Sequence, residues 1–464
     1  MKPKIMVWAS AITVFAALVA SFPLAAQDTK SKNNPQKHVR YTVKVLSTLG
    51  GSSGVGNSVN NTGWISGGAN LTGDTTEHAA LWRNGVITDL GTLGGPDSFV
   101  NAPVKNQTGE IAGFAETSTP DPLGEAFCTG LTFFGFQDGV TCLGFIWQNG
   151  VMSPLPPLAG GNNSQAYGVN NRGQVVGFAE NGTQDATCTP PQILQFEAVI
   201  WEPHKRQIQQ LPPLSGDSDG AGAAINDNGE VAGCSGICAN VGGASCLHAV
   251  VWKDGSPTNI GGLGSLNLGT AINNRDQVLG LSLLPDNTTF HSFLWQEGVI
   301  TDLGTLPGHP LTFPGGINSK GQVVGHSCDS TDTYCVAYLW EDGVMTDLNT
   351  IIPSGLSVYL YYAGDINDRG EIAGIAVDPV TGASPAFLAI PCDEEHAYVD
   401  GCEDKPEDGT AVQRTSEHPG VVPPESVREQ LRRRRGFGGS WPARKDPAQP
   451  SQNERLEKSL EVGR

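Results

Sequence analysis

Ten cysteines are the residues of this 464-residue chain whose chemistry is easiest to anticipate. An even number of cysteines in an exported chain indicates disulfides. Cys234 and Cys238 have a spacing that metal ligands can use, but no histidine cluster accompanies them, so the metal interpretation is weak. Position predicts three pairs, Cys128–Cys142, Cys328–Cys335 and Cys392–Cys402. The connectivity of the other four stays open, and the working assignment is Cys234–Cys246 and Cys188–Cys238.

Nucleophilic and metal chemistry find little support in the sequence. Gly-x-Ser-x-Gly occurs at Gly50–Gly54 and Gly216–Gly220, but neither serine precedes the helix that a nucleophile elbow requires. Asp217 and Asp219, within Asp-Ser-Asp-Gly, resemble half of a calcium loop without the full EF-hand spacing. We assign no catalytic residue and no cofactor. Calcium at Asp217 and Asp219 stays a weak alternative to a plain turn.

Aromatic residues are the better candidates for a binding site. Tyr359, Tyr361, Tyr362 and His309 could form a platform for a sugar or a peptide, and the alternative is that they pack in the core. Trp64 is a fifth candidate, because it stands where the other repeats carry Gln or Glu. We expect Trp64 to be exposed.

Seven copies of one unit position all of these residues. The cleanest copy, Ile272–Gly308, has an Asn-Asn turn, a β-branched segment, a segment that ends at Trp295, and a last segment closed by Gly and Pro. Short apolar runs bounded by Asn-Gly or Glu-Gly turns predict strands joined in hairpins. The first turns begin 45 to 64 residues apart, at Asn60, Asn106, Asn170, Asn226, Asn273, Asn318 and Asn367. A four-stranded unit of roughly 40–50 residues is typical of a propeller blade.

The two ends of the repeat region predict that the array closes on itself. Tyr41–Gly51 matches the fourth strand of a unit but precedes the first unit, and the last unit stops after its third strand, Ala386–Ile390. A strand donated from the N-terminus would complete the last unit and protect the sheet edge. We therefore predict an all-β, seven-bladed propeller over residues 41–402, with the repeated tryptophans in its core. An open solenoid or paired sandwiches are the alternatives.

The units resemble the HAF repeat, which is found in extracellular bacterial repeat proteins and named for a His-Ala-Phe run. The Asn-Asn-x-Gly-Gln-Val-Val-Gly part is clearest at Asn170–Gly177. The His run appears as His78-Ala79-Ala80-Leu81-Trp82, His248-Ala249-Val250-Val251-Trp252 and His291-Ser292-Phe293-Leu294-Trp295. Other units replace this His with Leu143, Glu197, Val336 and Pro385, so we expect no catalytic role for it. The resemblance implies the repeat architecture and the compartment, and no activity.

Composition limits the partners. Between Tyr41 and Cys402 the chain has 10 Lys and Arg against 35 Asp and Glu. A surface this acidic repels phosphate backbones, so we exclude nucleic acid and expect an extracellular glycan or protein as partner. The alternative is that the acidity only keeps the protein soluble. We expect a monomer without a transmembrane segment.

The chain ends differ from the repeats. Residues 1–26 predict a cleaved signal peptide, because Lys2 and Lys4 precede an apolar run and small residues at Ala25 and Ala26 precede Gln27. We therefore expect a secreted or periplasmic protein. Residues 27–40 are polar, and residues 403–464 combine 12 Lys and Arg with 11 Asp and Glu and few apolar residues. We expect both segments to be disordered.

The repeats place sequence variation on one face. In a propeller, the connections from second to third strands and those between units emerge together. Here both kinds are long and variable, as in Ala115–Cys142 and Glu180–Phe196, whereas the opposite face has short, uniform turns. Variation on one rim of a rigid scaffold indicates binding. We predict a secreted, non-catalytic binding or scaffold protein. The alternatives are an extracellular enzyme acting on polysaccharide in the funnel, and a purely structural surface protein.

Overall fold

The computed structural model describes residues 40–101, 106–125, 127–128, 139–188, 190–238, 246–396 and 398–402. These residues belong to one compact unit that begins at Val39. The predicted signal peptide, nearly all of the linker and the C-terminal tail lie outside the described residues. Within the described ranges, no helix has the length and apolar composition to cross a membrane.

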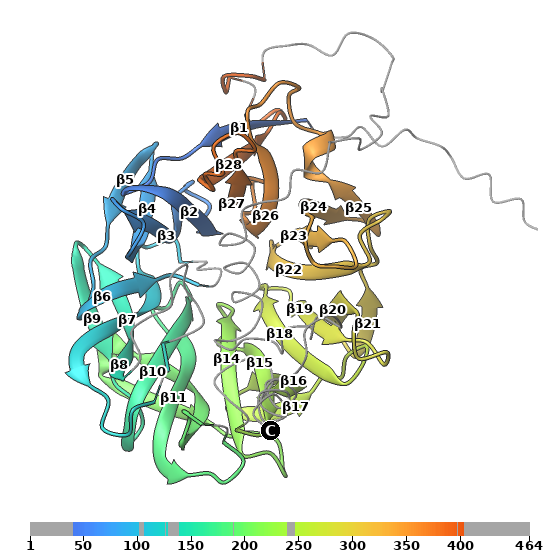
Figure 1. The fold of residues 1–464 in the computed structure, drawn as a ribbon. Helices are drawn as coiled ribbons and strands as arrows, with labels where there is room; N and C mark the ends of the chain where they lie inside the picture. The colour runs from blue at the N-terminus through green and yellow to red at the C-terminus, as the bar shows by residue number, and fades with distance from the viewer. Residues whose placement is uncertain are drawn as a thin grey trace, which may run out of the picture. The chain divides into compact units, whose positions relative to one another are not determined.

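Seven antiparallel four-stranded sheets form a ring, which confirms the seven-bladed β-propeller (Figure 1). The first, innermost strands are β2 (Gly50–Val59), β6 (Gly94–Phe99), β10 (Gly160–Val169), β14 (Asp219–Ile225), β18 (Leu266–Ile272), β22 (Leu311–Ile317) and β26 (Tyr359–Ile366). The second strands are β3 (Ile65–Leu71), β7 (Ile111–Pro120), β11 (Val175–Gln184), β15 (Val231–Gly236), β19 (Val278–Leu283), β23 (Val323–Cys328) and β27 (Ile372–Val377).

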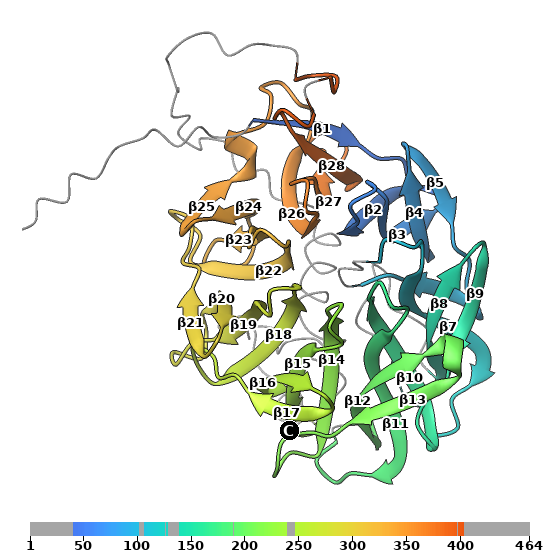
Figure 2. The same ribbon diagram turned by 180° about the vertical axis from the view of Figure 1, so that it is seen from behind.

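The third and fourth strands complete each blade. The third strands are β4 (Glu77–Arg83), β8 (Val140–Gln148), β12 (Leu194–Glu202), β16 (Cys246–Lys253), β20 (Phe290–Gln296), β24 (Cys335–Glu341) and β28 (Ala386–Pro391). The fourth strands are β5 (Val86–Asp89), β9 (Val151–Leu155), β13 (Gln207–Leu211), β17 (Ser256–Asn259), β21 (Val299–Asp302), β25 (Val344–Asp347) and β1 (Tyr41–Val45). Figure 2 shows β5, β9, β21 and β25 at the rim. Two 3-10 turns, η1 (Pro203–Lys205) and η3 (Leu348–Thr350), lie in connections.

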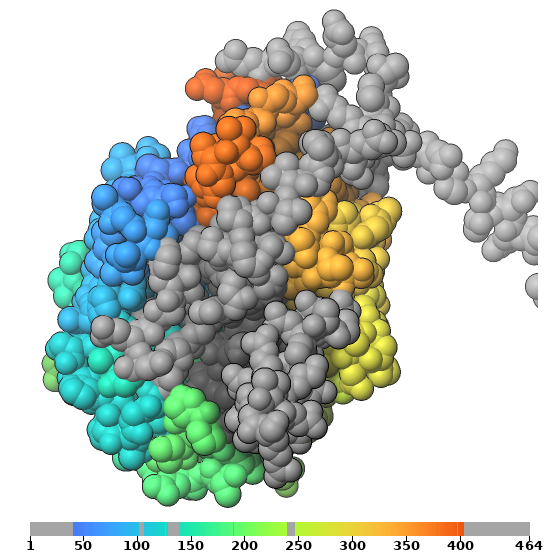
Figure 3. Space-filling model, viewed as in Figure 1, coloured from blue at the N-terminus to red at the C-terminus, as the bar shows by residue number. Residues whose placement is uncertain are grey.

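The N-terminal strand closes the ring as predicted. β1 pairs antiparallel with β28, from Tyr41 opposite Pro391 to Val45 opposite Phe387, and is the fourth strand of the seventh blade. In the space-filling view the first and seventh blades are adjacent (Figure 3). Closure also uses the loop between Cys392 and Cys402, because the Thr42 hydroxyl donates to the Asp400 carbonyl at 3.2 Å.

The seven repeated asparagines form a closed ring of hydrogen bonds. Each side-chain amide donates to the main-chain carbonyl of the equivalent asparagine in the next blade, at 2.8–3.3 Å, and Asn367 donates back to Asn60. Each Oδ1 also accepts from main-chain N–H groups two and four residues later, as Asn273 does from Arg275 and Gln277. The recurrent asparagine therefore holds its own turn and joins neighbouring blades. We call this side of the ring the turn face and the opposite side the variable-loop face.

Core packing explains the other repeated residues. Trp82, Trp201 and Trp252 are almost fully buried, which confirms their predicted core position, and each indole N–H donates to a main-chain carbonyl 35 to 45 residues earlier. The second-strand glycine is needed because the inner strand approaches closely. A Cβ on Gly177, for example, would lie 2.0 Å from the Gln165 carbonyl oxygen.

One buried apolar cluster receives side chains from every inner strand, and we call it the axial cluster. Its inner-strand members include Val55, Phe99, Tyr167, Ala221, Leu268, Phe313 and Tyr361. Four disulfides border or belong to the same cluster: Cys128–Cys142, Cys188–Cys238, Cys234–Cys246 and Cys328–Cys335. Together with Cys392–Cys402 these include the three predicted pairs, which are confirmed, and the two pairs of the working assignment, whose connectivity the sequence had left open.

Candidate binding site on the variable-loop face

A row of aromatic rings crosses the boundary between the sixth and seventh blades. His309, from the β21–β22 connection, lies 5.5 Å from Tyr334, measured between ring centroids. Tyr334, from the β23–β24 connection, stacks on Tyr359 at 6.3 Å with an interplanar angle of 28°. Tyr359 in turn contacts Tyr361 edge-on at 6.1 Å. We call His309, Tyr334 and Tyr359 the aromatic patch.

The predicted aromatic candidates differ in how deeply their side chains are buried. Tyr361 is fully buried in the axial cluster and Tyr359 is 8% exposed, so the three neighbouring tyrosines do not form the surface platform that the sequence suggested. Tyr362 is half-buried and makes an edge contact with His326 at 5.2 Å. Along an inner strand, alternate side chains face the two adjacent blades, and here both sides are packed. The accessible parts of the patch belong to His309 and Tyr334.

Tyr334 is the patch residue that the repeat pattern did not reveal. It lies in a connection outside the repeated strands, directly before Cys335, so an aromatic residue beside a predicted disulfide was its only signal. Asp329 caps the same loop by accepting from the main-chain N–H of Thr333 at 2.8 Å. Burial, followed by the charge of Asp347, raises the pKa of the Tyr334 hydroxyl. Its hydroxyl is therefore neutral at physiological pH.

Trp64 lies on the turn face, away from the aromatic patch. It is half-buried rather than fully exposed, and the Arg83 guanidinium carbon lies 3.8 Å from its ring centroid. In six blades the equivalent Glu or Gln accepts a hydrogen bond from the ring asparagine, whereas Trp64 replaces that acceptor in the first blade. The structure thus separates Trp64 from the other aromatic candidates.

Asp217 and Asp219 both make hydrogen bonds to protein groups. Asp217 Oδ2 accepts from the Ser235 hydroxyl at 2.6 Å and lies 2.9 Å from His248 Nδ1. Asp219 accepts from the Phe196 N–H and the Ser218 hydroxyl, and burial raises the pKa of Asp219 to about 6. Ser218 thus contacts a carboxylate, not a histidine. These contacts match a structural turn between the third and fourth blades.

The repeated His and the Thr-Asp-Leu aspartate pair with each other. His78 Nδ1 lies 2.9 Å from Asp89, and His291 Nδ1 lies 2.8 Å from Asp302. Burial opposes the charge on His78, but the hydrogen bond and charge of Asp89 outweigh it and raise the pKa of His78. Asp89 also accepts from the Gly91 N–H at 2.8 Å. The recurrent aspartate is thus a strand-end hydrogen-bond acceptor.

A buried carboxylate pair is the charged feature that sequence reasoning missed. Glu125 and Glu180 are both fully buried, and the Gln192 amide donates to Glu125 at 3.2 Å and to Glu180 at 3.0 Å. Glu125 also accepts from the N–H groups of Ile193 and Leu194, both at 2.7 Å. Burial, followed by the charge of Glu125, raises the pKa of Glu180 to about 8. The pair fastens the long connection of the second blade onto the third.

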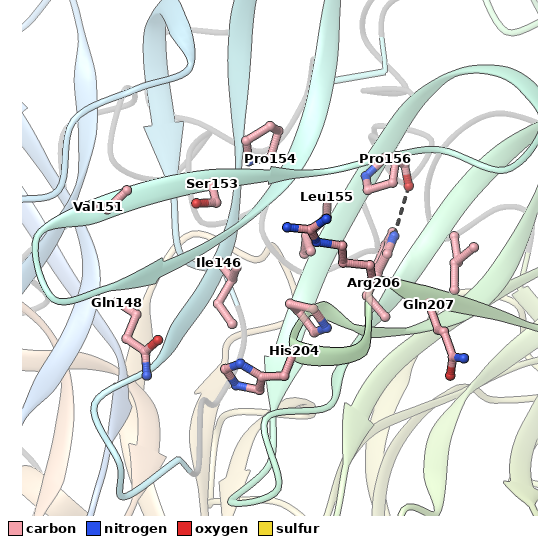
Figure 4. A pocket seen from close by; sticks show the side chains of 13 residues that line it. Ile146, Gln148, Val151, Ser153, Pro154, Leu155, Pro156, His204, Arg206 and Gln207 are labelled. Atoms are coloured by element: carbon pink, nitrogen blue, oxygen red, sulfur yellow. Dashed lines mark hydrogen bonds between the residues drawn. The ribbon is translucent and has the colours of Figure 1, made fainter.

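A groove lies between the outer parts of the second and third blades (Figure 4). Its volume is about 570 Å³. Ile146, Leu155 and Ile208 supply apolar walls, and the Trp201 N–H closes one end by donating to the Pro156 carbonyl at 2.9 Å. This groove contains none of the predicted site residues.

No protein-family model matches the chain, and a search of curated proteins finds no relative. Among solved structures, the β-propeller domain of the Trilobed protease from Pyrococcus furiosus shares 9% identity over 75% of this chain and 93% of its own, with a TM-score of 0.39. Oligogalacturonate lyase from Vibrio parahaemolyticus shares 9% identity over 77% of this chain and 98% of its own, with a TM-score of 0.38.

TolB from Acinetobacter baumannii shares 10% identity over 60% of this chain, with a TM-score of 0.37, and the chain spans 61% of TolB. The chain spans 52% and 50% of two acylaminoacyl peptidases. At these identities the similarities concern the fold alone.

Proposed function

We propose that this protein is exported and binds a neutral extracellular glycan, without catalysis, through the aromatic patch on the variable-loop face. The observation that carries the proposal is the row of rings from His309 through Tyr334 to Tyr359, which leaves two rings partly exposed. Flat aromatic faces provide large, rigid apolar contact area beside polar groups. Sugar rings, whose faces are lined by C–H groups, match that chemistry.

The surroundings of the patch support a neutral ligand. The chain carries 35 acidic against 10 basic residues between Tyr41 and Cys402, so an acidic polysaccharide would be repelled. Disulfides support a rigid site, because Cys328–Cys335 closes the connection that presents Tyr334. The five disulfides fit an extracellular or periplasmic compartment. Export by a cleaved signal peptide and membership of the HAF repeat family are part of the proposal.

Binding without catalysis is favoured by the packing along the axis. The axial cluster includes apolar side chains from all seven inner strands, and Glu125 and Glu180, whose pKa values are raised by burial, are both buried. A glycosidase needs two carboxyl groups that reach the scissile bond. These two do not reach the surface.

The test uses the purified, oxidised full chain with cellulose, soluble xyloglucan and polygalacturonate. We expect saturable retention on a neutral polysaccharide, none on polygalacturonate, and no release of reducing ends. Tyr334→Ala should weaken binding about tenfold, which corresponds to ~1.4 kcal/mol. Tyr398→Ala is the matched control, because Tyr398 is 97% exposed in the loop closed by Cys392 and Cys402.

Three results would count against the proposal. Equal binding by Tyr334→Ala and wild type would remove the aromatic patch from the site. Retention on polygalacturonate alone would contradict the neutral ligand. Reducing ends that accumulate in proportion to protein concentration would establish the enzyme alternative.

A further inference from the structure

The rim groove departs from the repeat in its turn. In five blades the turn from third to fourth strand is two residues long and ends in Gly, as at Asn149-Gly150 and Asp342-Gly343. In the third blade this turn is replaced by Pro-His-Lys-Arg, which forms η1 and ends at Arg206. Lys205-Arg206 is the only adjacent pair of basic residues between Tyr41 and Cys402. The longer turn thus concentrates positive charge in an acidic protein.

The neighbouring strands have lost the repeated acid. One position of the fourth strand pairs with the third-strand residue that lies two before the tryptophan. At this position the first, fifth and sixth blades carry Asp89, Asp302 and Asp347. The second, third and fourth blades carry Pro154, Gln210 and Asn259 at this register. The groove therefore lies where the acidic pattern of the rim is interrupted and basic residues are added.

Arg206 is the cation that stays available in this groove. The Lys205 ammonium bonds to Glu202 at 2.9 and 3.0 Å, and His204 lies 2.8 Å from Glu110. The Arg206 side chain forms no hydrogen bond or ion pair with any residue that the structure describes, and Figure 4 shows it extending toward β9. Its φ of 53° is a conformation that non-glycine residues adopt at a cost. The same conformation occurs in the third-to-fourth-strand turns of other blades, as at Asn149 and Asp342, so it belongs to the turn.

One wall of the groove is formed by β9. β9 is the edge strand of its sheet and pairs only with β8, so its outer main-chain groups are not used by any described strand. Val151, Ser153, Pro154 and Leu155 of β9 line the groove. Pro154 and Pro156 have no N–H to donate, so a peptide in this groove is held by side chains and not by addition of a strand to β9.

We propose that this groove binds an extended acidic peptide segment of a partner protein. A carboxylate of the peptide pairs with Arg206, and its apolar side chains pack on Ile146, Leu155 and Ile208. Charge complementarity directs the peptide to this groove, because the acidic surface of the rest of the propeller repels an acidic partner and Arg206 attracts it. This interaction is independent of glycan binding at the aromatic patch.

The test measures fluorescence anisotropy of the full chain with a labelled nonapeptide of three Glu-Val-Pro repeats. We expect saturable binding that weakens as salt is added, and at least tenfold weaker binding of the counterpart in which Gln replaces every Glu. Arg206→Gln should weaken binding of the acidic peptide about 10- to 100-fold. Arg206→Gly should do the same while keeping the turn, because glycine accepts the positive φ.

Arg275→Gln is the matched control, because Arg275 lies on the turn face of the fifth blade and donates to the Ser319 carbonyl. It should bind the peptide like wild type. Equal binding of the acidic and Gln peptides, unchanged binding by both Arg206 variants, or no saturable binding below about 1 mM would each overturn the proposal. Tighter, Arg206-dependent binding to anionic phosphatidylglycerol vesicles would also overturn it, in favour of a membrane surface.

Discussion

Removal of one ring asparagine should destabilise the whole propeller. Asn273 is 6% exposed and its side chain makes four hydrogen bonds. Its amide donates to the Asn318 carbonyl at 2.9 Å and to Gln277 Oε1 at 2.8 Å. Its Oδ1 accepts from the N–H groups of Arg275 and Gln277, at 2.9 and 3.1 Å. Asn273→Ala removes all four.

The expected loss of stability can be worked out from the groups that lose their hydrogen-bond partners. The Gln277 N–H is buried and would lose an acceptor, at about 1–3 kcal/mol. The other three bonds are worth about 0.5–1.5 kcal/mol each. We therefore expect Asn273→Ala to lower the free energy of unfolding by about 2.5–7.5 kcal/mol. The loss should be at the upper end if bonds around the ring strengthen one another.

Asn274 provides the matched control one residue away. It bonds to the turn of the preceding blade, because its amide donates to Asp227 Oδ2 and its Oδ1 accepts from the Asp227 N–H, both at 2.9 Å, but these bonds are exposed to solvent. Asn274→Ala should cost less than about 1.5 kcal/mol. Urea unfolding of the oxidised proteins, followed by tryptophan fluorescence and circular dichroism, measures both. Equal costs for the two variants would refute the view that the buried ring holds neighbouring blades together.

Two further predictions concern pH and closure. Burial and the charge of Glu125 raise the pKa of Glu180 from 4.5 to about 8, so the folded state holds an extra proton between these values. The contribution of Glu180 to the free energy of unfolding should thus be greatest below pH 4.5 and be lost as the pH rises through 8. In urea titrations from pH 5 to 9, Glu180→Gln should remove this pH dependence. A slope that persists in Glu180→Gln would contradict the assignment. Replacing Cys392 and Cys402 by Ser should cost about 3 kcal/mol by the loop-entropy relation and speed amide exchange in β1. Unchanged exchange in β1 would show that the loop does not hold the closing strand.

Repetition made the fold predictable from the sequence. Seven asparagine turns and the third-strand tryptophans located the blades, and the displaced fourth strand at Tyr41 predicted closure through β1. The disulfides followed from the same register, because cysteines that bracket one second-to-third connection must lie close together. Cys188–Cys238 is different, since it joins connections of adjacent blades, and the repeat register alone did not assign it.

The site was less predictable, because it depends on residues outside the repeat. Neighbouring tyrosines in sequence point to different sides of an inner strand, and burial of Tyr361 follows from packing against adjacent blades. Tyr334 stands where the matching loops of the first and fifth blades carry Thr76 and Thr289, and Glu125 lies in the long connection of the second blade. Their partners, Tyr359 and Glu180, are 25 and 55 residues away in sequence. Such contacts follow from the register of neighbouring blades and not from a local pattern.

Amide hydrogen exchange of the full chain, with and without the neutral polysaccharide that it retains best, tests the central claim most directly. Glycan binding at the aromatic patch predicts slower exchange at residues 305–311 and 329–336, with little change in the turn-face segment 60–64. Protection confined to the turn face, or no saturable retention on any neutral polysaccharide, would contradict the proposed function.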